Sequence, residues 1–149
     1  MNNNLPQRKN IRLKYYDYSS SGFYFVTICI KNRMQVLGNI NDNDIKLTRE
    51  GIIAKNNIIN IERIFENVTI DEYIIMPNHI HMIIEINKQS KVTLSRIIKQ
   101  YKGVVTKQVG YPIWQKLYYE YIIRNEKEYF IIKQYIQNNI INWGKDKYF

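Results

Sequence analysis

Residues 68–86 constrain the fold of this chain more than any other segment. Two apolar runs rich in branched side chains, at 68–76 and 79–86, are separated only by Pro77 and Asn78. Branched and aromatic residues favour strands, and a Pro-Asn pair favours a turn. The segment is therefore predicted to form two consecutive strands joined by a tight turn.

The remaining elements follow from the same kinds of pattern. Apolar runs predict further strands at 23–30 and 113–123. Apolar positions at helical spacing predict helices at about 49–65 and 94–108, and a last helix at 126–142. The residues expected to cap these helices are Thr48, Thr93 or Ser95, and Asn125.

The order of the predicted elements points to one fold class. A strand, a helix, two strands, a helix, a strand and a final helix form an α+β chain. Its β-α-β-β-α-β part is the ferredoxin-like arrangement, a four-stranded antiparallel sheet with two helices on one face. The final helix is expected on the other face. The length of 149 residues suits a single domain, 1–149, with a basic N-terminal arm at 1–22.

The chain has two histidines, and both lie in the third predicted strand as His79 and His81. Residues i and i+2 of a strand point to the same face, ~6.6–6.8 Å apart along the chain. Both imidazoles can therefore reach one divalent ion or one phosphate, although two neutral histidines packed beside the sheet are the alternative. Met82 and Ile84 occupy the other face, so the histidines are expected to point toward the last helix.

The last helix offers a partner for the histidine pair. Tyr135 and Asn139 are four residues apart and are expected on one helical face. The histidines and the Asn139 oxygen could hold Mg²⁺ or Mn²⁺, and the tyrosine could attack a phosphodiester there. As an alternative, Tyr135 also fits an apolar stripe of the helix. Tyr129 lies six positions away, ~600° of helical turn, and cannot face the same way.

The formal net charge is +9, and the basic residues are segregated along the chain. No acidic residue occurs in residues 1–14, nor between Glu85 and Glu120. Segregated positive charge is typical of proteins that bind polyanions such as nucleic acids, although a solvated basic face is the alternative. The residues predicted to contact DNA are Arg8, Lys9, Arg12, Lys14, Arg96, Lys99, Lys102 and Lys107.

Several classes of protein are excluded by composition. The single cysteine, Cys29, excludes an internal disulfide and multi-cysteine zinc sites. Two histidines, with Ile83 in the place of a third, exclude three-histidine zinc sites and histidine-triad nucleotide hydrolases. Without a ~20-residue apolar run or a signal-peptide apolar region, a cytoplasmic protein with no membrane partner is expected. The chain also lacks a Gly-rich phosphate-binding motif, so no nucleotide cofactor is expected.

The motifs together resemble those of the REP-associated tyrosine transposases. This family lies within the single-tyrosine HUH endonucleases, which include the single-strand insertion-sequence transposases. The most specific stretch is Met-Pro-Asn-His-Ile-His at residues 76–81. The other matching stretches, in the same order, are 8–18, 25–29, 72–75, 113–115, 123–126 and 135–139.

The resemblance implies a metal-dependent DNA nuclease and strand transferase that acts on single-stranded or hairpin (palindromic repeat) DNA, as a monomer or homodimer. His79 and His81 match the metal-binding pair, and Asn139 matches a third ligand of Mg²⁺ or Mn²⁺. Tyr135 matches the nucleophile that forms a 5′-phosphotyrosine link. Relatives often have proline where this chain has Ile140, which allows the last helix to run further here.

Three other functions are compatible with parts of the pattern. Rolling-circle nucleases and relaxases of the same superfamily usually carry extra domains, for which 149 residues leave no room. RNA-recognition modules on a ferredoxin-like sheet place exposed aromatic residues where this chain has histidines. A domesticated relative that binds hairpins without cutting them is not distinguished by sequence from an active enzyme.

Overall fold

The computed structural model describes residues 21–143. Its helices are α1 (Arg49–Ile64), α2 (Leu94–Val109) and α3 (Glu126–Gln137), with one short 3-10 turn, η1 (Lys31–Arg33). Its strands are β1 (Ser21–Ile30), β2 (Gly38–Asn41), β3 (Asp44–Leu47), β4 (Val68–Ile75), β5 (His79–Asn87) and β6 (Trp114–Ile123).

Four strands form the main sheet in the order β4-β5-β1-β6, and every neighbouring pair is antiparallel. The two central strands are therefore β5, which carries both histidines, and its neighbour β1. With α1 between β1 and β4, and α2 between β5 and β6, this is the predicted ferredoxin-like β-α-β-β-α-β order. The predicted α+β fold class is confirmed.

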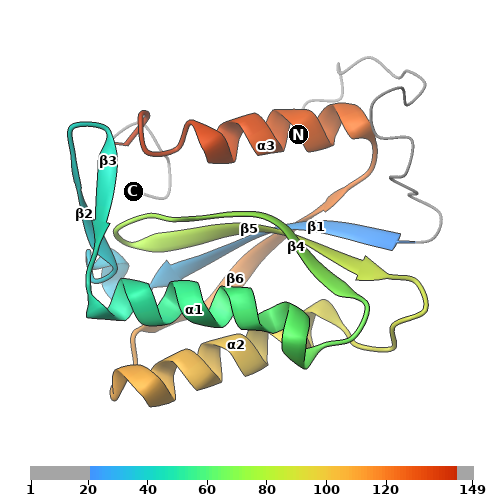
Figure 1. The fold of residues 1–149 in the computed structure, drawn as a ribbon, viewed down its shortest axis with the longest axis horizontal. Coiled ribbons are helices and arrows are strands. Elements are labelled where there is room, and N and C mark those ends of the chain that lie inside the picture. The colour runs from blue at the N-terminus through green and yellow to red at the C-terminus, as the bar shows by residue number, and fades with distance from the viewer. Residues whose placement is uncertain (1–20, 144–149) are drawn as a thin grey trace.

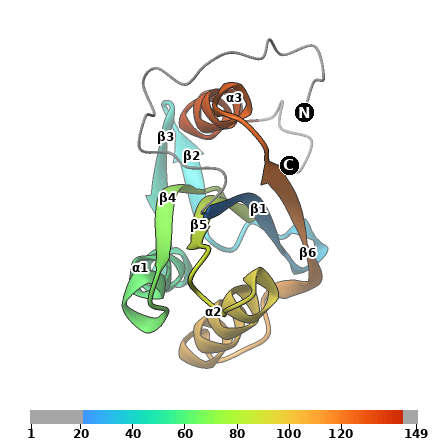
Figure 2. The ribbon, with the colours of Figure 1, turned by 90° about the vertical axis from the view of Figure 1, so that its right-hand side faces the viewer.

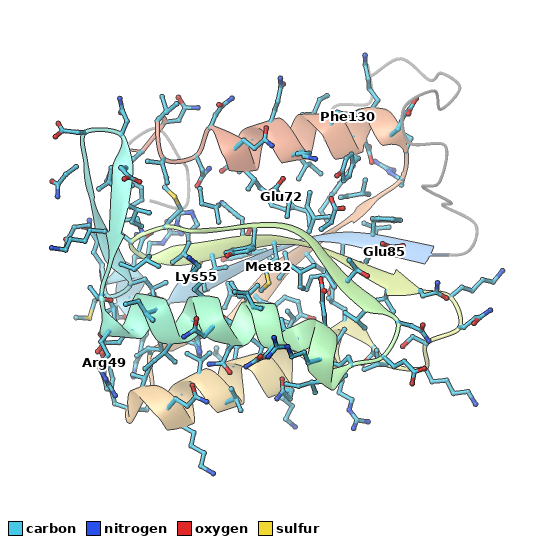
Figure 3. The ribbon with its side chains drawn as sticks, in the orientation of Figure 1. Arg49, Lys55, Glu72, Met82, Glu85 and Phe130 are labelled. Carbon is cyan, nitrogen blue, oxygen red and sulfur yellow. The ribbon has the colours of Figure 1, made fainter. Side chains whose placement is uncertain are left out.

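Helices cover both faces of the sheet, as Figure 1 and the turned view in Figure 2 show. α1 and α2 lie on one face, and α3 crosses the other. Figure 3 shows Met82 in the layer between the sheet and α1, and Glu72 in the layer between the sheet and α3. Alternation along β5 creates this division, because successive side chains of a strand point to opposite faces.

The hydrophobic core is correspondingly split into two clusters. The larger one packs Met82 and Ile84 against α1 and α2, where Ile58, Ile97 and Tyr101 are fully or almost fully buried. The smaller one lies under α3. Its buried members are Phe23, Ile83, Ile123, Tyr129, Ile132 and Ile136.

The predicted helix starts are confirmed by their caps. The Thr48 hydroxyl accepts the Gly51 N–H at 3.1 Å, and the Asn125 side chain accepts the Glu128 N–H at 2.9 Å. For α2 the cap is Thr93, which accepts the Arg96 N–H at 3.2 Å. Each bond satisfies one of the backbone N–H groups that a helix leaves unpaired at its start.

A second, two-stranded sheet was not predicted. β2 and β3 pair as a hairpin that stands beside the main sheet and rises to the level of α3 (Figure 1). Its turn residues, Asp42 and Asn43, have φ angles of 53° and 63°. Asp and Asn tolerate this left-handed conformation, which two-residue hairpin turns require. The Asx-rich sequence between Ile40 and Ile45 was the signal that could have identified it.

The last helix is shorter than predicted. α3 ends at Gln137, whereas the sequence pattern indicated a helix over 126–142 that could continue past Ile140. Asn138 is the C-cap, with φ −96° and ψ 5°, and the chain then continues in turns to Trp143. Asparagine competes with helical backbone bonding through its own side chain, so two consecutive asparagines end a helix without needing a proline. In the part of the chain from 21 to 143, no helix is long and apolar enough to cross a membrane.

Candidate active site

His79 and His81 are the first and third residues of β5, and they lie on the face that α3 covers. Both side chains are completely buried, and their ring centroids lie 4.7 Å apart. They share this face because β5 is regular from its first residue. The prediction that the two imidazoles lie side by side toward the last helix is confirmed.

Each histidine is held through its Nδ1 atom by a different neighbour. His79 Nδ1 lies 2.7 Å from Asn78 Oδ1, and His81 Nδ1 lies 2.8 Å from Thr27 Oγ1. Thr27 is the residue of β1 directly opposite His81 in the antiparallel register. Asn78 comes from the turn before β5, and its Nδ2 donates to the Arg33 carbonyl at 3.4 Å.

Tyr135 lies over this pair from α3. The centroid of its half-buried ring is 5.3 Å from that of His81 and 6.1 Å from that of Phe25 on β1. On the other side, Trp143 stacks on His79 with centroids 6.4 Å apart. The structure thus brings the phenol and the two imidazoles together, as the sequence analysis predicted.

Tyr129, on the same helix, is directed elsewhere. Its ring is 3% exposed, and its hydroxyl donates a short hydrogen bond to Asp71 of β4. Beside it, Lys133 Nζ lies 4.0 Å from Glu72 Oε2 of the same strand. The prediction that Tyr129 cannot face the histidines together with Tyr135 is confirmed.

Asn139 lies two residues beyond the end of α3, not on its surface as predicted. Its backbone N–H donates to the Ile136 carbonyl at 3.2 Å, and the turn that contains it leads to Trp143, which stacks on His79. The side chain is 2% exposed, yet its Oδ1 accepts no hydrogen bond from any described residue. A buried carboxamide oxygen without a donor is costly, so this atom is suited to a ligand.

The start of α3 is fixed to β6 by Glu128. Its carboxylate accepts the Tyr121 hydroxyl at 2.8 Å, the Arg124 N–H at 2.9 Å and the Arg124 guanidinium at 3.2 Å. Burial by itself would raise the pKa of Glu128, but the bonds from the Arg124 backbone, Tyr121 and the Arg124 guanidinium outweigh it and lower the pKa. The carboxylate is therefore charged at neutral pH and anchors the helix that carries Tyr135.

The helix α2, which carries four of the predicted DNA-binding residues, lies on the opposite face of the sheet from α3, which covers the histidines (Figure 2). Arg96, Lys99 and Lys107 are exposed there. Their contact with DNA stays a prediction. Arg8, Lys9, Arg12 and Lys14 of the N-terminal arm lie outside the described residues.

Lys102 differs from the other basic residues of α2. Its ammonium donates to the carbonyls of Gln115 at 2.8 Å and Lys116 at 3.1 Å, and burial lowers its pKa. These two bonds connect α2 to β6, so the structure shows a role for this side chain within the fold. A DNA contact of Lys102 stays a prediction.

The side chains of His79, His81 and Asn139 fit a hard divalent ion only in part as ligands. Among residues 21–143, no three His, Cys, Asp or Glu side chains are arranged to hold a metal. Two imidazoles and a carboxamide oxygen remain as donors. They are neutral ligands that Mn²⁺ and Mg²⁺ accept, but Mg²⁺ in particular prefers several oxygens. The set suits an ion that receives its other ligands from a bound phosphate and water.

The sequence predicted that His79, His81 and Tyr135 lie together, but it did not indicate the residues that hold the two imidazole rings. Asn78 was interpreted as a turn residue, and Thr27 as part of an apolar strand. Thr27 could have been found only from the register of β1 against β5, which the sequence does not display. Asn78 could have been found from the sequence, because a polar side chain directly before His79 is a candidate partner for that imidazole.

No model of a known protein family matches the chain. A protein of Haemophilus influenzae (strain ATCC 51907 / DSM 11121 / KW20 / Rd), described only as uncharacterized, is 39% identical over 171 residues, covering 98% of this chain and 95% of that protein. Two solved structures are also similar. A REP-associated tyrosine transposase bound to a REP hairpin has a TM-score of 0.69 and 25% identity, covering 94% of this chain and 77% of that one. A candidate transposase of Deinococcus radiodurans R1 shares the fold, with a TM-score of 0.55 and 19% identity over 88% of this chain and 97% of that one.

The ferredoxin-like sheet and these neighbours define the class of the protein as a transposase-like domain. The similarity to a solved REP-associated tyrosine transposase supports the resemblance that the sequence motifs indicated.

Proposed function

We propose that the protein is a DNA endonuclease and strand transferase that cleaves and rejoins single-stranded or hairpin DNA. One observation carries the proposal: the Tyr135 ring lies 5.3 Å from His81, whose ring lies 4.7 Å from His79. A nucleophilic side chain beside a pair of potential metal ligands is the arrangement that phosphodiester transesterification needs. The hairpin DNA bound to the related transposase supports the class of substrate.

The reaction conserves the phosphodiester bond. The phenolic oxygen of Tyr135 attacks the scissile phosphorus, the bond from phosphorus to the 3′ oxygen breaks, and that oxygen takes up the proton that the phenol loses. The 5′ phosphate stays on Tyr135 as a phosphotyrosine. A 3′ hydroxyl can then attack the phosphotyrosine and restore both the DNA strand and the phenol. Rejoining needs no nucleotide cofactor, because no bond energy is lost to water.

His79, His81 and Asn139 are the residues that would hold a divalent ion, Mg²⁺ or Mn²⁺, at the site. When bound, such an ion polarises the scissile phosphodiester and offsets the charge that develops on it. The buried Asn139 Oδ1, which lacks a donor among the described residues, supports this assignment. Because all three ligands would be neutral, they would hold such an ion weakly by themselves, and oxygens of a DNA phosphate would supply further ligands, so metal and DNA are expected to bind cooperatively.

The basic residues proposed to bind DNA lie on α2 and in the N-terminal arm of the sequence. We propose that Arg96, Lys99 and Lys107 contact phosphates together with Arg8, Lys9, Arg12 and Lys14 of the arm, which are seven basic residues in all. The exposed cations of α2 and the histidines lie on opposite faces of the sheet. A DNA molecule that contacts both the α2 cations and the histidines must therefore pass around an edge of the sheet. A hairpin stem joined to a single strand could do so.

The proposal is tested with an end-labelled oligonucleotide that carries a palindromic hairpin and a single-stranded flank. With Mn²⁺ or Mg²⁺, the wild-type chain should form an adduct that survives denaturing electrophoresis. Tyr135→Phe should abolish the adduct. Tyr129→Phe is the matched control, because its hydroxyl faces Asp71, and it should still form the adduct.

An adduct formed by Tyr135→Phe would show that another residue is the nucleophile. Hairpin binding by the wild-type chain without any adduct, over a range of flanks and both metals, would instead indicate a non-catalytic or domesticated hairpin-binding protein.

A further inference from the structure

The two histidines are held in ways that determine which ring nitrogen carries the proton. A neutral imidazole has one protonated nitrogen and one with a lone pair, and the hydrogen bond made by one nitrogen sets the state of the other. Only the nitrogen with the lone pair can bind a metal ion. The partner of Nδ1 therefore decides whether Nε2 is a metal ligand.

Asn78 can only accept a hydrogen bond from His79. Its Oδ1, which lies 2.7 Å from Nδ1, has no proton to give, so the ring must donate. The bond is buried: Asn78 is 2% exposed and His79 is not exposed at all. With the proton on Nδ1, the lone pair of His79 is on Nε2.

The orientation of the Asn78 amide is supported from its other end. Nδ2 donates to the Arg33 carbonyl at 3.4 Å. A reversed amide would place an N–H group against Nδ1 and an oxygen against a carbonyl, which would lose both bonds. Arg33, the last residue of η1, has a left-handed backbone conformation with φ 55°.

Thr27 serves His81 in a position fixed by the sheet. It is the cross-strand neighbour of His81, it is 2% exposed, and its Oγ1 lies 2.8 Å from Nδ1. A hydroxyl can accept or donate. If His81 carries its proton on Nδ1, as His79 does, then the Thr27 hydroxyl accepts a hydrogen bond from the His81 Nδ1–H group.

We propose that Asn78 and Thr27 are positioning residues that hold His79 and His81 with the proton on Nδ1 and the lone pair on Nε2 before any metal binds. The inference rests on the proposed function, because it explains how the pair is prepared for a divalent ion. Partners of this kind orient metal-binding histidines, and their loss typically lowers metal affinity by about 10–100-fold. The pair would then bind an ion without first reorganising its protons.

The test uses the small number of histidines, which is two in the whole chain. In the full-length, metal-free protein labelled with ¹⁵N-histidine, long-range ¹H–¹⁵N spectra at a pH where both rings are neutral give one pattern per ring. Wild type should show the Nδ1–H form for both. Asn78→Ala should turn His79 to the Nε2–H form or a mixture, and should weaken Mn²⁺ binding, measured by calorimetry, by about 10–100-fold.

Two further variants separate this role from a merely structural one. Asn78→Asp keeps an acceptor at the same place and should keep His79 in the Nδ1–H form, which also covers the case in which Asn78→Ala does not fold. Thr27→Val should change His81 and leave His79 as in wild type.

The proposal is overturned if Asn78→Ala leaves the His79 form unchanged, if Asn78→Asp behaves like Asn78→Ala, or if Thr27→Val alters both rings. An Nε2–H form of either ring in wild type would overturn it as well. Because the spectra are recorded without DNA, a missing Tyr135 adduct would contradict the proposed function and not this inference.

Discussion

At the scale of single residues, the proposed role of Asn139 as a metal ligand has consequences for how tightly the site would hold an ion. A carboxamide supplies an oxygen without negative charge, so three neutral donors leave the site dependent on the substrate for further ligands. An aspartate in the same place would add one negative charge to a buried pocket. If Asn139 is a ligand as proposed, an asparagine at this position links the occupancy of the site to the presence of DNA.

Two substitutions of Asn139 should act in opposite directions. Asn139→Ala should weaken Mn²⁺ binding in the presence of uncleavable DNA and raise the metal concentration needed for cleavage, with DNA affinity in metal-free buffer unchanged. Asn139→Asp should raise Mn²⁺ affinity without DNA, because a charged oxygen replaces a neutral one. Calorimetry with Mn²⁺ measures both effects. Full cleavage by Asn139→Ala at low metal would leave the two histidines as the only protein ligands.

The site residues differ in how far the sequence could predict them. His79 and His81 were predictable because strand alternation places residues i and i+2 on one face without any knowledge of neighbours. Tyr135 was predictable from helical spacing. The placement of Asn139 on the last helix was wrong, because the end of a helix depends on local competition for backbone bonds. Thr27 depends on cross-strand register, a long-range property that no short pattern contains.

At the scale of elements, α3 is held at its start by charge. The Glu128 carboxylate is almost buried, with 5% of its side chain exposed, and receives three hydrogen bonds from Tyr121 and Arg124. These bonds to the charged form lower the pKa of Glu128 below its ordinary value of 4.5. The helix that carries Tyr135 is therefore stabilised by an ionised group.

The contribution of Glu128 should depend on pH in a defined direction. A carboxyl whose pKa is lowered by folding stabilises the native state above its unfolded pKa, and this stabilisation is lost as the pH falls through the folded value. Glu128→Gln should lower the free energy of unfolding by about 1–2 kcal/mol at pH 7, and the difference from wild type should shrink steadily below about pH 4.5.

Thermal or urea unfolding at several pH values measures this difference. Glu66→Gln, at an exposed position after α1, is the matched control and should differ little from wild type at any pH. A Glu128→Gln difference that stays constant down to acid pH would show that the carboxylate charge is not what holds α3.

At the scale of the whole molecule, the sheet separates the proposed chemistry from the basic surface of α2. The histidines and Tyr135 lie on one face, and Arg96, Lys99 and Lys107 are exposed on the helix that covers the other. Binding and cleavage should therefore be separable by mutation. The fold itself was predictable because the order of strand and helix patterns leaves few topologies, whereas the β2–β3 hairpin rests on short, weak patterns.

The α2 surface should control the salt dependence of DNA binding. Each phosphate contact contributes about 0.7–0.9 to the slope of log K against log salt, so Arg96→Gln with Lys99→Gln should reduce the slope by about 1.4–1.8. Mn²⁺ affinity without DNA should not change. The matched control is Lys55→Gln, which removes an exposed lysine of α1 (Figure 3) and should leave the slope unchanged. An unaltered slope in the double variant would place the DNA away from α2.

The division of the core into two clusters has a consequence for local unfolding. α3 is held to the sheet by the smaller cluster, in which six residues are buried, whereas α1 and α2 share the larger one. Protection from hydrogen exchange follows the local free energy of opening, which rises with the apolar area that an element buries. Amides of α3 should therefore exchange through an opening that leaves β1 and β5 protected. Native-state hydrogen exchange followed by mass spectrometry measures the protection of α3 separately from that of β1 and β5. Equal protection of α3 and β5 would contradict this expectation. On this expectation, Tyr135, the proposed nucleophile, could move away from the histidines and return while the sheet beneath it stays folded.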